Sequence, residues 1–143
     1  MPDNLARIKA IGFAFAGQWM LAENGIAFEL VEDVATARNV LYAFVVDGDL
    51  VYVGKTVLAL HDRMQRYKTP AKSSAKGGTT NIKNNGNILE SLRQRRTVEI
   101  FVLADNGLQN LGEFHVNLAA GLEDSLVRQL KPAWNGGKNE STE

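Results

Sequence analysis

Two apolar runs separated by three turn-forming residues constrain the fold more than any other feature of the sequence. Residues 40–46 (VLYAFVV) and 50–53 (LVYV) consist of β-branched, aromatic and aliphatic side chains, and Asp47-Gly48-Asp49 lies between them. β-Branched and aromatic residues favour strands, and an Asp-Gly pair between two such runs favours a tight turn. Residues 40–53 are therefore predicted to form a β-hairpin.

The loop of this hairpin decides whether Tyr42 and Tyr52 lie on the same face of the sheet. A two-residue turn places them on opposite faces, because side chains alternate along a strand. A three-residue loop, or a β-bulge, pairs Phe44 with Tyr52 and brings both tyrosines to one face, with Gly54 opposite Tyr42. The missing side chain of Gly54 would leave space for a substrate group near the phenol. In that register the other face is formed by Ala43, Val45, Val51 and Val53.

The remaining pattern predicts an α/β (α+β) domain with a small three-stranded sheet, mixed or antiparallel, flanked by helices. Residues 69–87 are rich in Lys, Ser, Gly, Thr and Asn, which favours a mobile surface loop. Periodicity and strand-forming runs indicate helices at 3–10, 58–67, 88–95 and 118–130, and strands at 13–15, 26–30 and 97–103.

The domain prediction divides the chain into three parts. With 143 residues and 45% apolar composition, the chain is long enough to bury a core without disulfides. Residues 39–135 hold the best-defined elements and are expected to form the main domain, preceded by an N-terminal extension at 1–38. Pro132 ends the last helix, and residues 136–143 are expected to be a disordered tail.

The absence of cysteine excludes a disulfide framework and a cysteine-based zinc site or nucleophile. It fits a reducing compartment, and the cytoplasm is the expected location. No stretch approaches 18 uninterrupted apolar residues, so association with a membrane is not expected.

The charges are unevenly distributed along a chain whose net charge is +0. Residues 55–100 carry ten basic and three acidic side chains, whereas acidic residues are in excess on both sides of this block. A charge run is often only a solvated surface, but a cationic strip on a neutral protein also suits a polyanionic partner. The ten basic residues are Lys55, Arg63, Arg66, Lys68, Lys72, Lys76, Lys83, Arg93, Arg95 and Arg96.

Glu123 lies within the apolar stripe of the predicted C-terminal helix, which contains Ala119, Leu122, Leu126, Val127 and Leu130. A carboxylate at such a position needs a partner, and either a salt bridge or a metal ion would provide one. A half-exposed glutamate at the edge of the stripe is an equally good interpretation of periodicity alone. The two histidines, His61 and His115, do not have the spacing of a paired metal site.

These motifs together resemble the GIY-YIG nuclease superfamily. Leu41-Tyr42 precedes Tyr52-Val53-Gly54-Lys55 by ten residues, and Arg63 and Tyr67 follow, as in that family's two tyrosine strands and arginine helix. Residues 122–135 (LEDSLVRQLKPAWN) are similar to its glutamate helix and trailing Pro-x-x-Asn, most closely to the GIY-YIG domain of the bacterial excision-repair nuclease. The resemblance covers residues 39–135, and its five elements occur in the family's order.

The sequence departs from the family pattern at three places. Val40-Leu41-Tyr42 replaces Gly-Ile-Tyr, and Tyr67 stands where many members carry histidine. Arg63 lies one residue further from Tyr52 than expected, and its position before Tyr67 makes it a better match than Arg66.

The resemblance implies a metal-dependent endonuclease that hydrolyses phosphodiester bonds. Glu123 would hold one divalent ion, Mg²⁺ with Mn²⁺ as a substitute, together with water molecules and the substrate phosphate. Arg63 would bind phosphate oxygens, because its planar fork is always charged. Tyr42 or Tyr52 would position or deprotonate the attacking water, and Lys55 could lower the pKa of a tyrosine. Asn135 is expected to support the site by hydrogen bonding.

DNA is the expected partner, and the basic side chains would bind its phosphates without reading bases. The expected phosphate-binding residues are Arg66, Lys68, Lys72, Lys76, Lys83, Arg93, Arg95 and Arg96. Restriction, repair and mobile-element nucleases share these motifs, so specificity stays open, as does a homodimer. The alternatives are a GIY-YIG-like module that binds nucleic acid without cutting it, and an ordinary structural domain.

Overall fold

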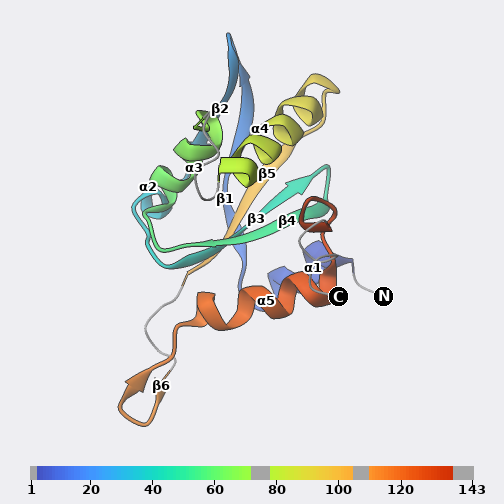
Figure 1. Cartoon of the computed structure of the whole chain (residues 1–143). Coiled ribbons are helices and arrows are strands. Elements are labelled where there is room, and N and C mark those ends of the chain that lie inside the picture. The colour runs from blue at the N-terminus through green and yellow to red at the C-terminus, as the bar shows by residue number, and fades with distance from the viewer. Residues whose placement is uncertain (1–2, 72–77, 105–109, 137–143) are drawn as a thin grey trace.

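A five-stranded antiparallel sheet forms the centre of the protein in the computed structural model, which describes residues 3–71, 78–104 and 110–136 (Figure 1). The spatial order of the strands is β2-β1-β5-β3-β4, so β2 and β4 are the edges. The strands are β1 (Ala14–Ala22), β2 (Gly25–Leu30), β3 (Val40–Val46), β4 (Asp49–Thr56) and β5 (Val98–Ala104).

The prediction of a three-stranded sheet is wrong, because β1 and β2 extend it to five. β1 pairs with β5 from Ala14 opposite Val102 to Trp19 opposite Val98. β2 then pairs with β1 on the outer side. The alternating side chains near the N-terminus indicated two strands, and the predicted 26–30 matches β2, but the predicted 13–15 covers only the beginning of β1. Local periodicity also does not reveal which distant strand will be the neighbour.

The β3–β4 hairpin contains both a two-residue turn and a β-bulge. Asp47 and Gly48 have φ values of 48° and 88°, and two positive φ angles are what a type I′ turn requires. Val51 is the extra residue of the bulge, so Phe44 pairs with Tyr52 and Tyr42 pairs with Gly54. The bulge thus unites the two tyrosines on one face, as one of the predicted alternatives required.

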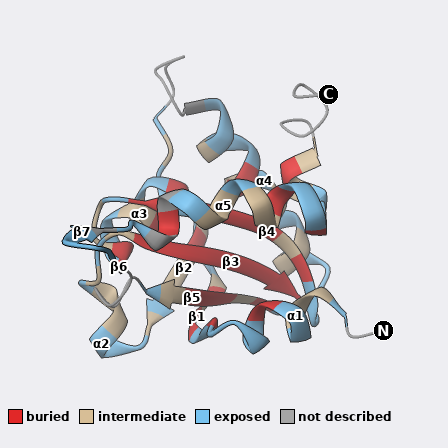
Figure 2. Cartoon of the chain, turned by 90° about the horizontal axis from the view of Figure 1, so that it is seen from below, coloured by how far each residue is buried: buried red, intermediate tan, exposed pale blue. Residues whose placement is uncertain are grey.

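Helices cover both faces of the sheet and produce two hydrophobic clusters. On the tyrosine face, α3 (Leu60–Lys68) and α4 (Gly78–Arg93) contribute Leu60, Met64, Tyr67 and Ile88. On the other face, α1 (Asn4–Ala10) and α5 (Leu118–Leu130) pack against Ala43 and Val53. Val51 was predicted to lie on this second face, but it packs on the tyrosine face. Figure 2 shows β3 buried along its length between these layers.

The remaining elements are short: α2 (Glu32–Ala35), β6 (Asn110–Leu111), β7 (Phe114–His115) and a 3₁₀ turn, η1 (Ala133–Asn135). The β6–β7 hairpin, which the sequence did not predict, projects from the body of the protein (Figure 1). The predicted helix at 118–130 has the same bounds as α5. In the described part of the chain, no helix is both long and apolar enough to cross a membrane.

The predicted loop at 69–87 is wrong for its second half, because α4 already begins at Gly78. Its asparagines form contacts that a solvent-exposed loop would not provide. Asn84 is buried, and Asn85 Nδ2 donates a hydrogen bond of 2.9 Å to the Tyr67 carbonyl at the end of α3. Polar residues thus dock α4 onto α3.

Candidate active site

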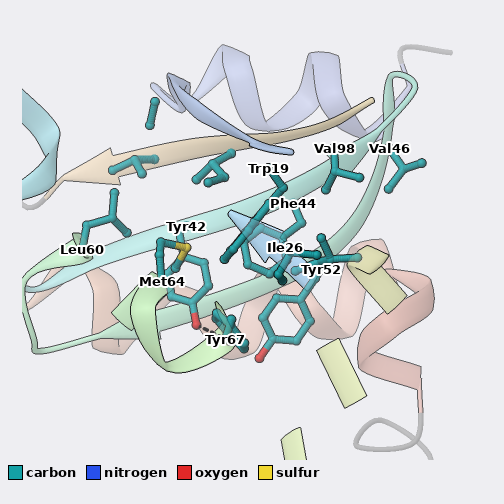
Figure 3. Packing of buried hydrophobic residues seen from close by; sticks show 14 of the residues in the cluster. Trp19, Ile26, Tyr42, Phe44, Val46, Tyr52, Leu60, Met64, Tyr67 and Val98 are labelled. Atoms are coloured by element: carbon teal, nitrogen blue, oxygen red, sulfur yellow. Dashed lines mark hydrogen bonds between the residues drawn. The ribbon is translucent and has the colours of Figure 1, made fainter. Parts of the chain in front are cut away.

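Tyr42 and Tyr52 lie side by side on the helix-covered face of the hairpin. Their ring centroids are 6.2 Å apart, and Phe44 packs against both. Tyr42 is fully buried, whereas Tyr52 keeps 8% of its surface exposed. Figure 3 shows both hydroxyl groups pointing to the same side of the sheet, towards Tyr67. The prediction that the two tyrosines share a face is confirmed.

Tyr67 connects this pair of strands to the arginine on α3. Its hydroxyl oxygen lies 2.6 Å from that of Tyr42, a hydrogen bond in which either can donate. Arg63 Nη2 also donates to the Tyr67 hydroxyl, at 2.9 Å. The two residues are one helical turn apart, which places both side chains on the same face of α3. The family's histidine position is therefore filled by a buried phenol that links Arg63 to Tyr42.

The Arg63 guanidinium is held on a second side by α4. Its Nη1 donates to Asn81 Oδ1 at 2.9 Å, and its Cζ lies 4.3 Å from the Tyr67 ring centroid. Arg63 is half-buried, whereas Arg66 on the same helix is exposed. The structure thus brings Arg63, and not Arg66, to the tyrosines.

Burial controls the protonation of the tyrosines. It is the main cause that raises the pKa of Tyr42, Tyr52 and Tyr67 far above 10, and the Arg63 charge only partly opposes it. Burial lowers the pKa of Arg63, but the neighbouring tyrosines outweigh this effect and the net pKa is raised. At neutral pH the cluster therefore contains three neutral phenols around one guanidinium cation.

Gly54 is required by the closeness of the two phenols. A Cβ atom there would lie 2.7 Å from the Tyr42 hydroxyl oxygen and 2.9 Å from Tyr52 Cε2. Such distances are shorter than van der Waals contact, so no larger residue fits without movement of a ring. The space opposite Tyr42 is filled by its own hydroxyl, and the expectation that Gly54 leaves room for substrate there is not met.

Glu123 approaches this cluster from the opposite layer. It is half-buried on α5, which packs against the edge strand β4. Its negative charge is among the causes that raise the pKa of Tyr52, after burial and the repulsion from Tyr67. The charge of Glu123 therefore acts on Tyr52, although α5 and the tyrosine cluster lie on opposite faces of the sheet.

Asn135 forms hydrogen bonds with the backbone of Val53, the residue of the edge strand that lies between Tyr52 and Gly54. Its Oδ1 accepts a hydrogen bond from the Val53 N–H at 3.0 Å, and its Nδ2 donates to the Val53 carbonyl at 3.1 Å. Both groups point outward from the sheet, where no further strand would satisfy them. The buried Asn135 side chain therefore takes the place of a sixth strand at this position.

Lys55 lies apart from the cluster. It is exposed and pairs with Leu41, whose side chain belongs to the cluster on the α5 side. Arg63 is the cation among the main influences on the pKa of Tyr42 and Tyr52. The expectation that Lys55 lowers the pKa of a tyrosine is not supported by this placement.

Those of the predicted phosphate-binding residues that the structure describes lie in two groups along α4. Arg66, Lys68 and Lys83 are exposed near the junction of α3 and α4. Arg93 is the last residue of α4. It lies about 18 Å from Asn81 along the helix axis, because an α-helix rises about 1.5 Å per residue. Arg95 and Arg96 follow it there, while Lys72 and Lys76 lie outside the described residues.

The resemblance implied a helix that begins near Asn81, but sequence reasoning missed that the side chains of Asn81 and Asn85 form hydrogen bonds with α3. Their spacing of four residues was a helical signal, but it lies in a run (NIKNNGN) whose composition favours a loop. Only the position of α3 shows that these polar side chains have buried partners.

Comparison with known proteins places this geometry in a fold. No family model and no curated protein match the sequence. Among solved structures, a mutant of EndoII from bacteriophage T4, a GIY-YIG nuclease, matches with a TM-score of 0.68 and 21% identity, over 94% of this chain and 99% of that one. The chain has the GIY-YIG nuclease fold. The restriction endonuclease HPY188I, in complex with product DNA, also matches, with a TM-score of 0.56, 14% identity, and coverage of 90% and 78%.

Proposed function

We propose that this GIY-YIG chain is a metal-dependent endonuclease that hydrolyses phosphodiester bonds in DNA. The observation that carries the proposal is the convergence of Arg63, Tyr42, Tyr52 and Tyr67 on one side of an edge strand that Glu123 approaches from the other. Two of its structural neighbours are a restriction endonuclease in complex with product DNA and a GIY-YIG nuclease, which supports the same reaction class.

Arg63 is suited to bind the phosphate that is attacked. Two of its five donors are held by the neutral acceptors Asn81 and Tyr67, and Tyr42 is a further neutral hydrogen-bonding partner among the described residues. The five-donor fork can still offer other N–H groups to phosphate oxygens. Within the described residues it forms no ion pair with a carboxylate, so its positive charge is not cancelled. A half-buried cation stabilises developing negative charge more strongly than a fully solvated one.

The tyrosines are proposed to orient the attacking water by hydrogen bonding. Tyr52 is the only one of the three with measurable exposure, so its hydroxyl is the best placed to contact substrate or water. Because burial raises its pKa, the Tyr52 phenol keeps its proton until a neighbouring cation stabilises the phenolate. Deprotonation of water by a tyrosine would therefore depend on Arg63 and on the charge of a bound metal ion.

The donor set fits a metal that is shared between protein and substrate. Among the described residues there is no group of three His, Cys, Asp or Glu side chains that could form a complete metal cage. Mg²⁺ is commonly held by one or two carboxylates, water and substrate phosphate, and a single half-buried Glu123 is compatible with that arrangement. When bound, the ion would polarise the phosphate and stabilise the leaving oxygen.

The basic side chains at the junction of α3 and α4 are proposed to bind the flanking phosphates. Arg66, Lys68 and Lys83 are exposed there and lie close in sequence to the residues of the cluster. Such contacts fix the DNA in place without reading its bases. Specificity for a sequence or a DNA structure would have to come from other parts of the surface.

The test is incubation of supercoiled plasmid with the purified protein and Mg²⁺ or Mn²⁺, with a parallel sample in EDTA. The proposal predicts nicked or linear product that depends on the metal. A gel-shift measurement in EDTA separates the alternative function, because binding of DNA without any metal-dependent cleavage would indicate a binding module. Mapping the cuts then distinguishes fixed fragments, which require sequence recognition, from a smear, which does not.

A further inference from the structure

The polar face of α4 that docks on α3 contains two asparagines with different partners. Asn81 accepts a hydrogen bond from the Arg63 side chain, whereas Asn85, one turn later, donates to the backbone carbonyl of Tyr67. The first contact fixes a side chain of the candidate site, and the second fixes the end of a helix. This difference allows the two roles to be separated experimentally.

Because the Asn81 side chain is uncharged, it can orient the Arg63 guanidinium without neutralising its positive charge. Arg63 is held at both terminal nitrogens, by Asn81 through Nη1 and by Tyr67 through Nη2, each at 2.9 Å. Two anchored nitrogens fix the plane of the guanidinium fork, and the orientation of this fork determines whether it can bind two phosphate oxygens. An amide oxygen fixes the plane and leaves the charge available, whereas a carboxylate at this position would form an ion pair with it.

We propose that Asn81 is a positioning residue that holds the Arg63 guanidinium in the plane in which it binds the reacting phosphate. This inference rests on the proposed function for its catalytic consequence, but not for the contact itself. Asn81 acts only through Arg63, and it neither touches the reacting atoms nor binds the metal ion.

The first test compares the kinetics of Asn81→Ala and Asn81→Asp. Loss of one hydrogen bond to a charged group predicts that Asn81→Ala lowers kcat about 10- to 100-fold. KM should stay within about twofold, because the phosphate still meets an intact charge. Asn81→Asp keeps an acceptor but pairs it with the guanidinium, so KM should rise as well. Equal kinetics in wild type and both variants would overturn the proposal.

Two further variants control for loss of structure. Thr80→Ala changes the exposed neighbouring residue on α4 and should leave kcat, KM and Tm unchanged. Asn85→Ala removes a different hydrogen bond between α4 and the end of α3, and it should lower Tm while lowering kcat less than about threefold. If Asn85→Ala lowers kcat as much as Asn81→Ala does, the effect is a general loosening of the two helices and the positioning role is wrong.

A measurement without DNA separates this inference from the proposed function. In ¹⁵N NMR spectra, a guanidinium anchored at both terminal nitrogens rotates slowly and gives distinct Nη signals for Arg63. We expect these signals to merge in Asn81→Ala and to remain distinct in Thr80→Ala. A wild-type protein that cuts no DNA would refute the nuclease proposal but leave this result standing, whereas unchanged Arg63 signals in Asn81→Ala would refute the positioning role.

Discussion

Replacement of Gly54 by alanine tests the packing on which the tyrosine cluster depends. The added Cβ would lie 2.7 Å from the Tyr42 hydroxyl oxygen, 2.8 Å from its Cζ and 2.9 Å from Tyr52 Cε2. All three contacts are with aromatic side chains that are packed in the core rather than with flexible ends. The variant can therefore fold only if at least one ring moves.

The magnitude follows from two opposing effects. Overpacking of a core costs about 1–3 kcal/mol, and three close contacts with rings favour the upper part of that range. Replacement of glycine by alanine also lowers the entropy of the unfolded chain, which stabilises the folded state by about 0.4–1 kcal/mol. The free energy of unfolding should fall by about 1–2 kcal/mol, which corresponds to a decrease in Tm of roughly 2–8 °C. A ring displacement of about 1 Å is also expected to lower kcat at least tenfold.

The assay combines urea unfolding, thermal unfolding and plasmid cleavage, with Gly86→Ala as the matched control. Gly86 lies inside α4, and a Cβ added there would have no neighbouring atom within 4 Å, so alanine should raise stability by roughly 0.5–1 kcal/mol. The two Gly→Ala substitutions are thus predicted to shift Tm in opposite directions. A Gly54→Ala protein as stable and as active as wild type would refute the packing argument.

Three further predictions concern other parts of the site. Asn135→Ala removes both hydrogen bonds to Val53 and should lower the free energy of unfolding by about 2–4 kcal/mol in urea; a loss below about 1 kcal/mol would contradict the role of Asn135 at the strand edge. Because burial raises the pKa of Tyr67 above 10, the folded state keeps a proton that the unfolded state loses, so its stabilising effect is complete below pH 10 and is lost as the pH rises further. Tyr67→Phe should therefore flatten the fall of Tm above about pH 10, and an unchanged slope would count against the buried phenol. Arg66→Ala should weaken DNA binding and lower its salt dependence more than Arg95→Ala, because Arg95 lies just beyond the distant end of α4. Equal effects in a fluorescence titration would contradict this and show that residues at both ends of the helix bind DNA.

Local sequence patterns predicted the hairpin and the glutamate helix because each is encoded by consecutive residues. Strand-forming runs around Asp47-Gly48 indicate the turn, and the apolar stripe of α5 reproduces its bounds. The register required a further fact, since a two-residue turn alone would have separated the tyrosines. The bulge at Val51 reconciles the turn that Asp-Gly favours with the burial of both phenols on one face.

The features that the sequence did not predict depend on contacts between distant segments. β1 joins the sheet through β5, about eighty residues later, and α4 begins within a polar run whose asparagines bind α3. The link from Asn81 to Arg63 is of the same kind. Judged by composition alone, such residues are predicted to form a loop. Composition contains no information about the distant hydrogen-bonding partner that makes burial of a polar side chain favourable.

Cleavage of supercoiled plasmid by Glu123→Ala and Asp124→Ala, compared at saturating DNA with Mg²⁺, tests the central claim most directly. The two residues are adjacent on α5, but Glu123 is half-buried and its charge raises the pKa of Tyr52, whereas Asp124 is exposed and pairs with Arg128. If Glu123 holds the metal ion of a nuclease site, Glu123→Ala abolishes cleavage while its Tm and DNA affinity stay close to wild type, and Asp124→Ala cleaves normally. Cleavage by Glu123→Ala at the wild-type rate would contradict the assignment of this site.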